Sequence, residues 1–233
     1  MVMCGRFGFF ELKYFIELLR QLEIPFEEDE TYRFAPGYNI APESSVTVLL
    51  GNHNTATLTN AQWGLIPHWA KSIPKVRPIN ARSESLDTKP YFRHMFRNNH
   101  CLIPASGFYE WKRTEEARKQ PYYIHRTDNR PMAFAALWDR WKPPEKNEKP
   151  IISCGIITTE ANREMLSVHD RMPVILEPET WKDWLEAGKT GIENLLRPAR
   201  EGTIELYPVS TLLNNPQYIK KNCIDRLDSE APL

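Results

Sequence analysis

Prolines are spaced along this chain in a way that limits the length of its secondary-structure elements. The 233 residues include 19 prolines but only 10 glycines. Proline pre-sets turns and cannot donate a hydrogen bond within a β-ladder. We therefore expect many fixed loops between short strands.

The apolar pattern agrees with this expectation. Helices are predicted over residues 11–23 and 91–98, and after Pro178, where Trp181, Trp184 and Leu185 share one face. Strands are predicted at residues 46–50, 55–63, 101–104, 108–112, 121–126, 132–138, 151–158, 172–176 and 204–209. Residues 64–80 contain three prolines and should form a long ordered loop, a feature that is often functional. This order predicts an α+β fold, with a curved, mostly antiparallel sheet or open barrel and peripheral helices, rather than a βαβ repeat.

Length and composition limit the class of protein. We expect one domain over residues 1–228, a surface loop at 142–150 and a frayed end at 229–233. The absence of a long apolar run or signal-peptide pattern predicts a cytoplasmic protein that does not enter membranes. With 30 basic and 30 acidic residues the net charge is zero, which argues mildly against a nucleic-acid binder. The arginines at 77, 82, 93 and 97 are close enough in the sequence to form a local basic groove.

The four cysteines form no C-x-x-C pair, so they predict neither a zinc site nor a thioredoxin-like redox motif. Cys101 and Cys154 lie in apolar strands and are expected in the core, as are Trp63, Trp111 and Trp138. A cofactor is not indicated either, because no glycine-rich phosphate loop is present.

Cys4 is chemically the most distinctive residue. If Met3 is the start and is removed, Cys4 has both a thiol and a free α-amine. Such an aminothiol condenses with an aldehyde to a Schiff base, and the thiol then closes a five-membered thiazolidine. About a tenth of such an amine is neutral and nucleophilic at pH 7. By position alone, however, most lone cysteines are structural.

Three further segments contain candidate catalytic groups. If residues 78–84 form a strand, Asn80, Arg82 and Glu84 share one face. Glu110 lies among aromatic residues, where desolvation would raise its pKa into the range of a general acid or base, although an ordinary edge-strand Glu would look the same. His169 can exchange protons near pH 7, and Asp170 or Arg171 could tune it, but a lone His is more often a packed or surface residue.

Six segments together resemble the SOS-response-associated peptidase (SRAP) family, and they follow the family's order over nearly the whole chain. They are Met3-Cys4-Gly5-Arg6-Phe7, Tyr38-Asn39-Ile40-Ala41-Pro42, Trp63-Gly64-Leu65-Ile66-Pro67, Ile79-Asn80-Ala81-Arg82-Ser83-Glu84, Gly107-Phe108-Tyr109-Glu110-Trp111 and His169-Asp170-Arg171-Met172-Pro173. A chance match of one segment would be unremarkable, whereas six in order are hard to explain otherwise.

The resemblance implies a function in DNA repair. Family members trap abasic sites in single-stranded DNA through the N-terminal cysteine, as a thiazolidine crosslink that shields the lesion during the DNA damage response. The family's catalytic Asn, Glu and His correspond to Asn80, Glu110 and His169. The implied roles are orientation for Asn80, proton transfer in lyase-like Schiff-base chemistry for Glu110, and sugar ring opening for His169.

We expect the DNA contacts to come mainly from three arginines. Arg6, Arg82 and Arg171 are the candidates for phosphate binding, with Asn39 and Trp69 as weaker contacts. Trp69 would stack on a base. The expected partner is abasic single-stranded DNA, bound by a monomer that associates with the nucleoid when on DNA, without metal or organic cofactor.

The start Met1-Val2-Met3-Cys4 departs from the family pattern, because the chemistry requires cysteine as the first residue. We expect translation to begin at Met3, or residues 1–3 to be removed as a leader, and the chain with Met1 present to be blocked. Two alternatives stay open. Cys4 and His169 could form a cysteine-type autopeptidase that removes the residues before Cys4, or the chain could be a non-catalytic module that binds single-stranded DNA.

Overall fold

The computed structural model describes residues 4–52, 55–113, 119–145, 148–186, 188 and 190–227. The expectations for the leader at 1–3 and the end at 229–233 lie outside these residues. The loop at 142–150 is described only in part.

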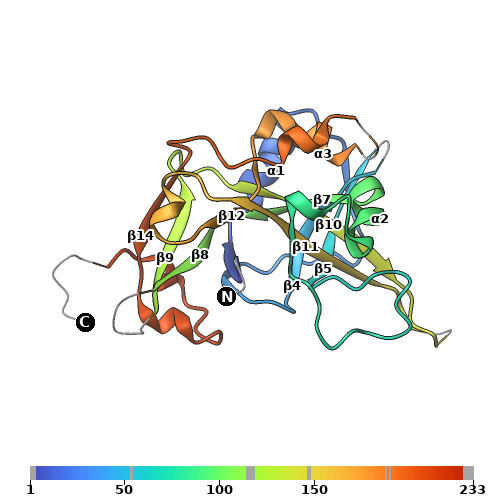
Figure 1. The fold of residues 1–233 in the computed structure, drawn as a ribbon, viewed down its shortest axis with the longest axis horizontal. Coiled ribbons are helices and arrows are strands. Elements are labelled where there is room, and N and C mark those ends of the chain that lie inside the picture. Colours follow the sequence, from blue (N-terminus) through green and yellow to red (C-terminus); the bar gives the residue numbers. More distant parts are fainter. Residues whose placement is uncertain are drawn as a thin grey trace.

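Five strands form a closed barrel, which is the larger of the two β-structures in the molecule (Figure 1). Its strands are β4 (Ser45–Leu50), β5 (Ala56–Trp63), β7 (His100–Ala105), β10 (Met132–Trp141) and β11 (Ile151–Glu160). They pair in the order β11-β10-β7-β4-β5, and all these pairs are antiparallel. The ring closes because β5 also pairs with β11 in parallel, with Trp63 opposite Cys154.

Four short strands extend the barrel edges. β2 (Phe26–Glu28) pairs with β5, β13 (Ile175–Leu176) with β10, and both β6 (Asn80–Arg82) and β12 (Arg171–Pro173) with β11. The predicted strand at 172–176 is therefore two strands, divided at Val174, whose N–H bonds to Ile157 on β11 while its carbonyl bonds to Ala135 on β10. β6 and β12 are far apart in the sequence, and their pairing with β11 brings them close together in space.

A second antiparallel sheet lies beside the barrel, at the left of Figure 1. Its order is β14-β9-β8-β1-β3. The bounds are Ile204–Pro208 for β14, Lys119–Arg126 for β9, Gly107–Arg113 for β8, Arg6–Phe9 for β1 and Gly37–Ile40 for β3. Arg6 on β1 lies opposite Tyr109 on β8, so this pairing brings the start of β1 to the middle of β8.

Three α-helices are present in the described residues, at the predicted places. They are α1 (Leu12–Gln21), α2 (Pro90–Asn98) and α3 (Trp181–Leu185). α2 begins at Pro90, where the missing proline N–H costs nothing. Both α2 and α3 contact β7, and every residue of β7 is buried. The predicted α+β class, with a curved and mostly antiparallel sheet and peripheral helices, is confirmed.

Aromatic residues join the two sheets in one hydrophobic core. Phe7 on β1 packs edge-on against Trp63 and Phe134 of the barrel, at centroid distances of 5.1 and 6.0 Å. Cys101, Cys154 and Trp63 are fully buried, as predicted. Trp111 and Trp138 are only half-buried, but each packs against a cluster of buried residues, so their predicted packing holds in part. In the described residues no helix is both long and apolar enough to cross a membrane.

Candidate functional site

Cys4 and Glu110 meet where β1 begins beside β8. Cys4 directly precedes this strand pair, has a positive φ of 45° and is completely buried. Its backbone N–H donates a hydrogen bond to the carboxylate of Glu110, although the two residues are 106 positions apart. The β1–β8 pairing explains this contact, because it places the residues before Arg6 beside those after Tyr109.

Burial dominates the electrostatics of this pair. Glu110 is 1% exposed, and desolvation raises the pKa of its carboxyl to about 7, although hydrogen bonds from the backbone of Cys4 and Trp111 oppose the shift. The negative charge of Asp170 adds to the increase. The pKa of the Cys4 thiol is raised well above its ordinary value by burial and by the charge of Glu110. The carboxyl can therefore both take and give a proton near neutral pH.

Asn80 and Arg82 lie on β6, which pairs in parallel with β11. Asn80 is partly buried and Arg82 is exposed. The predicted strand alternation ends at Arg82, because Ser83–Ser85 form the 3₁₀ helix η1. Glu84 does not continue the strand face but contacts Arg171.

Arg171 is held on the other side of β11 by a two-pronged ion pair. Its Nη1 and Nη2 donate to the two carboxylate oxygens of Glu84 at 2.9 and 3.1 Å, and Nη2 also donates to the carbonyl of Thr158 at 2.8 Å. Partial burial favours a higher pKa for Glu84, but the hydrogen bonds and charge of Arg171, together with hydrogen bonds from the Glu84 backbone and Ser83, lower that pKa overall. Arg171 thus connects β12, β11 and η1, and 17% of its side chain stays exposed.

His169 precedes β12, and 11% of its side chain is exposed. Its Nδ1 accepts a hydrogen bond from the backbone N–H of Arg171 at 3.1 Å, and Nδ1 is 2.8 Å from an oxygen of Asp170. When the ring is neutral and Nδ1 accepts, the proton is on Nε2, which is then a donor. When the ring is charged, Nδ1–H pairs with Asp170 instead. The charge of Asp170, the residue that follows His169, also acts on Glu110.

Arg6 is fixed by a second group of contacts. Its Nη1 donates to Oδ1 of Asn39 at 2.8 Å and to the carbonyl of Leu213 at 3.3 Å, and its guanidinium carbon lies 5.7 Å from the ring centroid of Trp111. Burial lowers the pKa of Arg6, which still leaves it charged.

Asn39, an expected DNA contact, is 3% exposed. Its Nδ2 donates to the carbonyls of Asn215 and Tyr218 at 3.3 and 2.8 Å. The structure therefore places Asn39 between Arg6 and the C-terminal segment, which we define as residues 209–227. The indole N–H of Trp111 donates to Oδ1 of Asn214, in the same segment, at 2.6 Å. The sequence gives no signal for this segment, because it contains no catalytic type of residue in a recognisable pattern.

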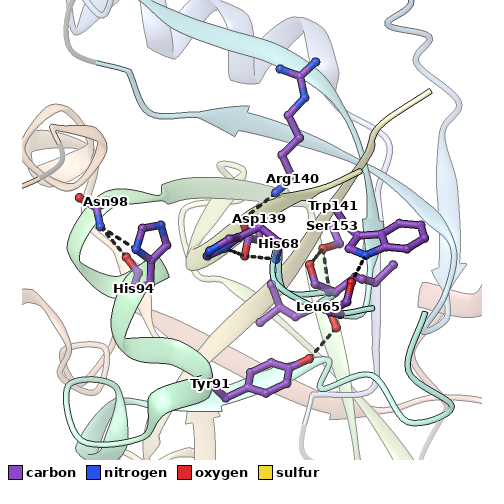
Figure 2. A network of polar contacts seen from close by, with 11 residues as sticks. Leu65, His68, Tyr91, His94, Asn98, Asp139, Arg140, Trp141 and Ser153 are labelled. Carbon is purple, nitrogen blue, oxygen red and sulfur yellow. Dashed lines mark hydrogen bonds and ion pairs between the residues drawn. The ribbon is translucent and has the colours of Figure 1, made fainter. Parts of the chain in front are cut away.

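Trp69 projects from the loop formed by residues 64–79 and is 59% exposed. Figure 2 shows how the barrel holds this loop. Asp139 accepts hydrogen bonds from the backbone N–H and from Nδ1 of His68, at 2.8 and 2.9 Å. Tyr91 donates to the carbonyl of Leu65 at 2.9 Å, and its ring lies 6.0 Å from Trp69, edge-on. The exposed indole is thus carried on an ordered loop.

The described residues include no group of three or more His, Cys, Asp or Glu side chains placed to hold a metal ion. The structure brings Cys4 and Glu110 into contact, and it places Asn80 and His169 at the two short strands that pair with β11.

Comparisons with known proteins identify the family of this chain. The family model described as "SOS response associated peptidase (SRAP)" matches residues 3–216. Abasic site processing protein YoqW of Bacillus subtilis is 40% identical over 92% of this chain and 96% of its own. Abasic site processing protein YedK of Escherichia coli is 31% identical over 82% of this chain and 83% of its own. A crystal structure of a Bacteroides thetaiotaomicron protein has a TM-score of 0.72 and 27% identity, covering 82% of this chain and 85% of its own. The chain belongs to the SRAP family.

Proposed function

We propose that this protein processes abasic sites in single-stranded DNA by forming a covalent thiazolidine through Cys4. The names of the relatives YoqW and YedK support abasic sites as the substrate. The observation that carries the proposal is the contact between the Cys4 nitrogen and Glu110. It puts a carboxyl with a pKa of about 7 beside the nitrogen that has to lose and regain protons.

The reaction begins with opening of the abasic sugar. The bond from C1′ to the ring oxygen breaks, the ring oxygen takes a proton from Nε2 of the protonated His169 ring, and a water molecule takes the proton of the C1′ hydroxyl as the aldehyde forms. In the protonated ring Nδ1–H pairs with Asp170, 2.8 Å away, which leaves Nε2–H to donate. Asn80 orients the sugar or the Cys4 amine.

Crosslinking then proceeds in two steps. Glu110 takes a proton from the Cys4 ammonium, and the free amine adds to the aldehyde carbon. Glu110 returns the proton to the resulting hydroxyl, which leaves as water, and a Schiff base remains. The thiol sulfur adds to the same carbon while its proton moves to the nitrogen, closing the ring. One water is lost overall, and the closure is intramolecular.

Binding without the covalent bond relies on charge. Arg6, Arg82 and Arg171 bind phosphates beside the lesion, and Trp69 stacks on a base. Asn39 supports this by holding Arg6 rather than by touching DNA. The adduct shields the lesion during the damage response. A monomer suffices, and no step uses a metal or an organic cofactor.

The same Cys4–Glu110 contact favours one alternative, removal of residues 1–3 by the chain itself. The Cys4 thiol would give its proton to Glu110 and attack the carbonyl of Met3, and the Cys4 nitrogen would leave with that proton from Glu110. Water would then hydrolyse the thioester and release the tripeptide. This activity would produce the free aminothiol that crosslinking requires.

The test uses protein that begins at Cys4, mixed with a single-stranded oligonucleotide that carries one abasic site. We expect a denaturant-resistant adduct whose mass is the sum of both components less one water. Glu110→Gln should slow its formation by about 10² to 10⁴-fold, the usual contribution of a general acid–base group.

The controls are Cys4→Ala and the full chain from Met1, monitored by intact mass over time. An absence of adduct with the Cys4 form would disprove crosslinking and leave the binding module as the function. Loss of residues 1–3 from the full chain, but not from its Cys4→Ala variant, would establish the autopeptidase.

A further inference from the structure

The C-terminal segment borders the candidate site at Arg6 and Asn39. Val209, Leu213 and Cys223 are completely buried, in a cluster with Tyr109 and Tyr123 of the second sheet. In Figure 1 this red part of the chain lies along β8 and β9, near the N-terminal end. Its carbonyls accept hydrogen bonds from Arg6 and Asn39, so the segment lies directly beside Arg6.

Two lysines lie on the outer side of this segment, next to Tyr218, whose partly buried ring packs against the same cluster. Tyr218 is held by a 2.8 Å hydrogen bond from its hydroxyl to Oδ1 of Asn222. The Lys220 ammonium lies 6.0 Å from the centroid of that ring. Lys220 and Lys221 are exposed, and Ile219 between them and the ring is 66% exposed.

The charge of the segment fits a phosphate chain. Residues 209–227 contain three basic side chains and one acidic one. Arg226 is already engaged, at 3.7 Å from Glu205 and 4.5 Å from the ring centroid of Tyr207. The two lysines therefore supply the outward positive charge. A ring beside phosphate-binding cations is the combination that holds single strands irrespective of sequence.

We infer that the bound DNA strand continues from Arg6 along the C-terminal segment. There Tyr218 stacks on a base that flanks the abasic site, and Lys220 and Lys221 bind the phosphates of this flank. This inference rests on the proposed function. It adds a binding surface, formed in part by residues beyond 216, where the family match ends. An affinity gain from a longer flank is its direct consequence.

The experiment measures equilibrium binding of abasic oligonucleotides to the Cys4→Ala protein, in which no crosslink forms. One flank is lengthened at a time. We expect one of the two flanks to increase affinity when lengthened, and the double variant Lys220→Ala/Lys221→Ala to lose that gain. With two phosphate contacts removed, the slope of log K against log salt should become shallower by about 1.4.

Matched variants test whether the effect depends on where the lysines lie or only on the net charge of the protein. Lys13→Ala/Lys182→Ala removes two exposed lysines from α1 and α3, away from the C-terminal segment, and should leave both the flank effect and the slope unchanged. Tyr218→Phe keeps the ring and should bind like the parent, whereas Tyr218→Leu should weaken long-flank binding on the order of tenfold.

The outcomes distinguish this inference from the proposed function. A flank effect and salt slope that survive Lys220→Ala/Lys221→Ala overturn the binding surface, while crosslinking by the parent protein still supports the proposed function. Equal binding by Tyr218→Leu and Tyr218→Phe overturns the stacking. If the parent forms no adduct with any oligonucleotide, the proposed function fails first.

Discussion

Glu110 combines burial, charge and reactivity in one side chain. A carboxyl that is almost completely buried would normally be expensive to ionise, and here the N–H groups of Cys4 and Trp111 support the charged form. The fold thus keeps a titratable group at neutral pH in contact with the nitrogen of Cys4. Because the charged form is disfavoured, ionisation of Glu110 lowers the stability of the folded state.

Replacing Glu110 by Gln should change how stability depends on pH. In the folded state the pKa of Glu110 is raised from 4.5 to about 7, so the folded protein binds more protons than the unfolded chain between these values. The free energy of unfolding of the parent should therefore fall as pH rises through this window, by about 3 kcal/mol, and Glu110→Gln should lack this decrease.

Urea unfolding at pH 5 and pH 8 measures the effect. Gln keeps an acceptor for the two N–H groups, so the comparison isolates the charge. Equal differences between parent and variant at both pH values would show that Glu110 does not titrate in this window.

The loop of residues 64–79 is a long connection that is held in place by hydrogen bonds to the barrel. Its first part is fastened through backbone groups, with Ile66 donating to Oγ of Ser153 at 2.9 Å and Trp141 donating to the carbonyl of Ala70 at 2.7 Å (Figure 2). Such bonds satisfy a backbone that has no ladder partner. The loop then leads into Asn80, so its attachment also sets the start of β6.

Removal of Asp139 should release this loop locally. Asp139 is 3% exposed and accepts the N–H of His68, Nδ1 of His68 and the N–H of Arg140. Asp139→Ala leaves these donors without an acceptor, which we expect to cost about 1–3 kcal/mol and to speed amide exchange at His68.

The matched control is Asp87→Ala, which removes an exposed ion pair with Arg97 and should cost less than about 1 kcal/mol. Hydrogen exchange and urea unfolding give both readouts. If the two variants are equally stable and the loop amides exchange alike, Asp139 does not anchor the loop.

At the scale of the whole molecule, the closure of the barrel depends on a close approach between β11 and the chain after β5. A Cβ added to Gly155 would lie 2.8 Å from Cδ1 and 3.0 Å from Cγ of Leu65. The N–H of Gly64 bonds to the carbonyl of Cys154 at the same place. Glycine thus allows the two ends of the sheet to meet.

Gly155→Ala should destabilise the protein by about 1–3 kcal/mol through overpacking. Leu65→Ala alone should cost about 2–5 kcal/mol, because it leaves a cavity. Since the added methyl group would occupy part of that cavity, the double variant should be less destabilised than the sum of the two. Strict additivity in thermal or urea unfolding would contradict this account of the contact.

Much of the molecule could be predicted from the sequence, because the signals are local. The positions of the helices and of most strands follow from apolar period and proline spacing, which act within a few residues. The family and its candidate residues Cys4, Asn80, Glu110 and His169 follow from short motifs in a fixed order. The 83–85 helix and the split strand at Val174 were missed, since neighbouring strands decide where a ladder ends.

What only the tertiary structure decided is the set of contacts between distant residues. The closure of the barrel, the Cys4–Glu110 contact and the pairing of Arg171 with Glu84 all arise from strand pairing over long separations. The burial that raises the pKa of Glu110 is likewise a property of the packed core. The sequence determined which groups are available for chemistry, whereas the pairing of strands determined which of them touch, because such contacts form only when distant segments are packed together.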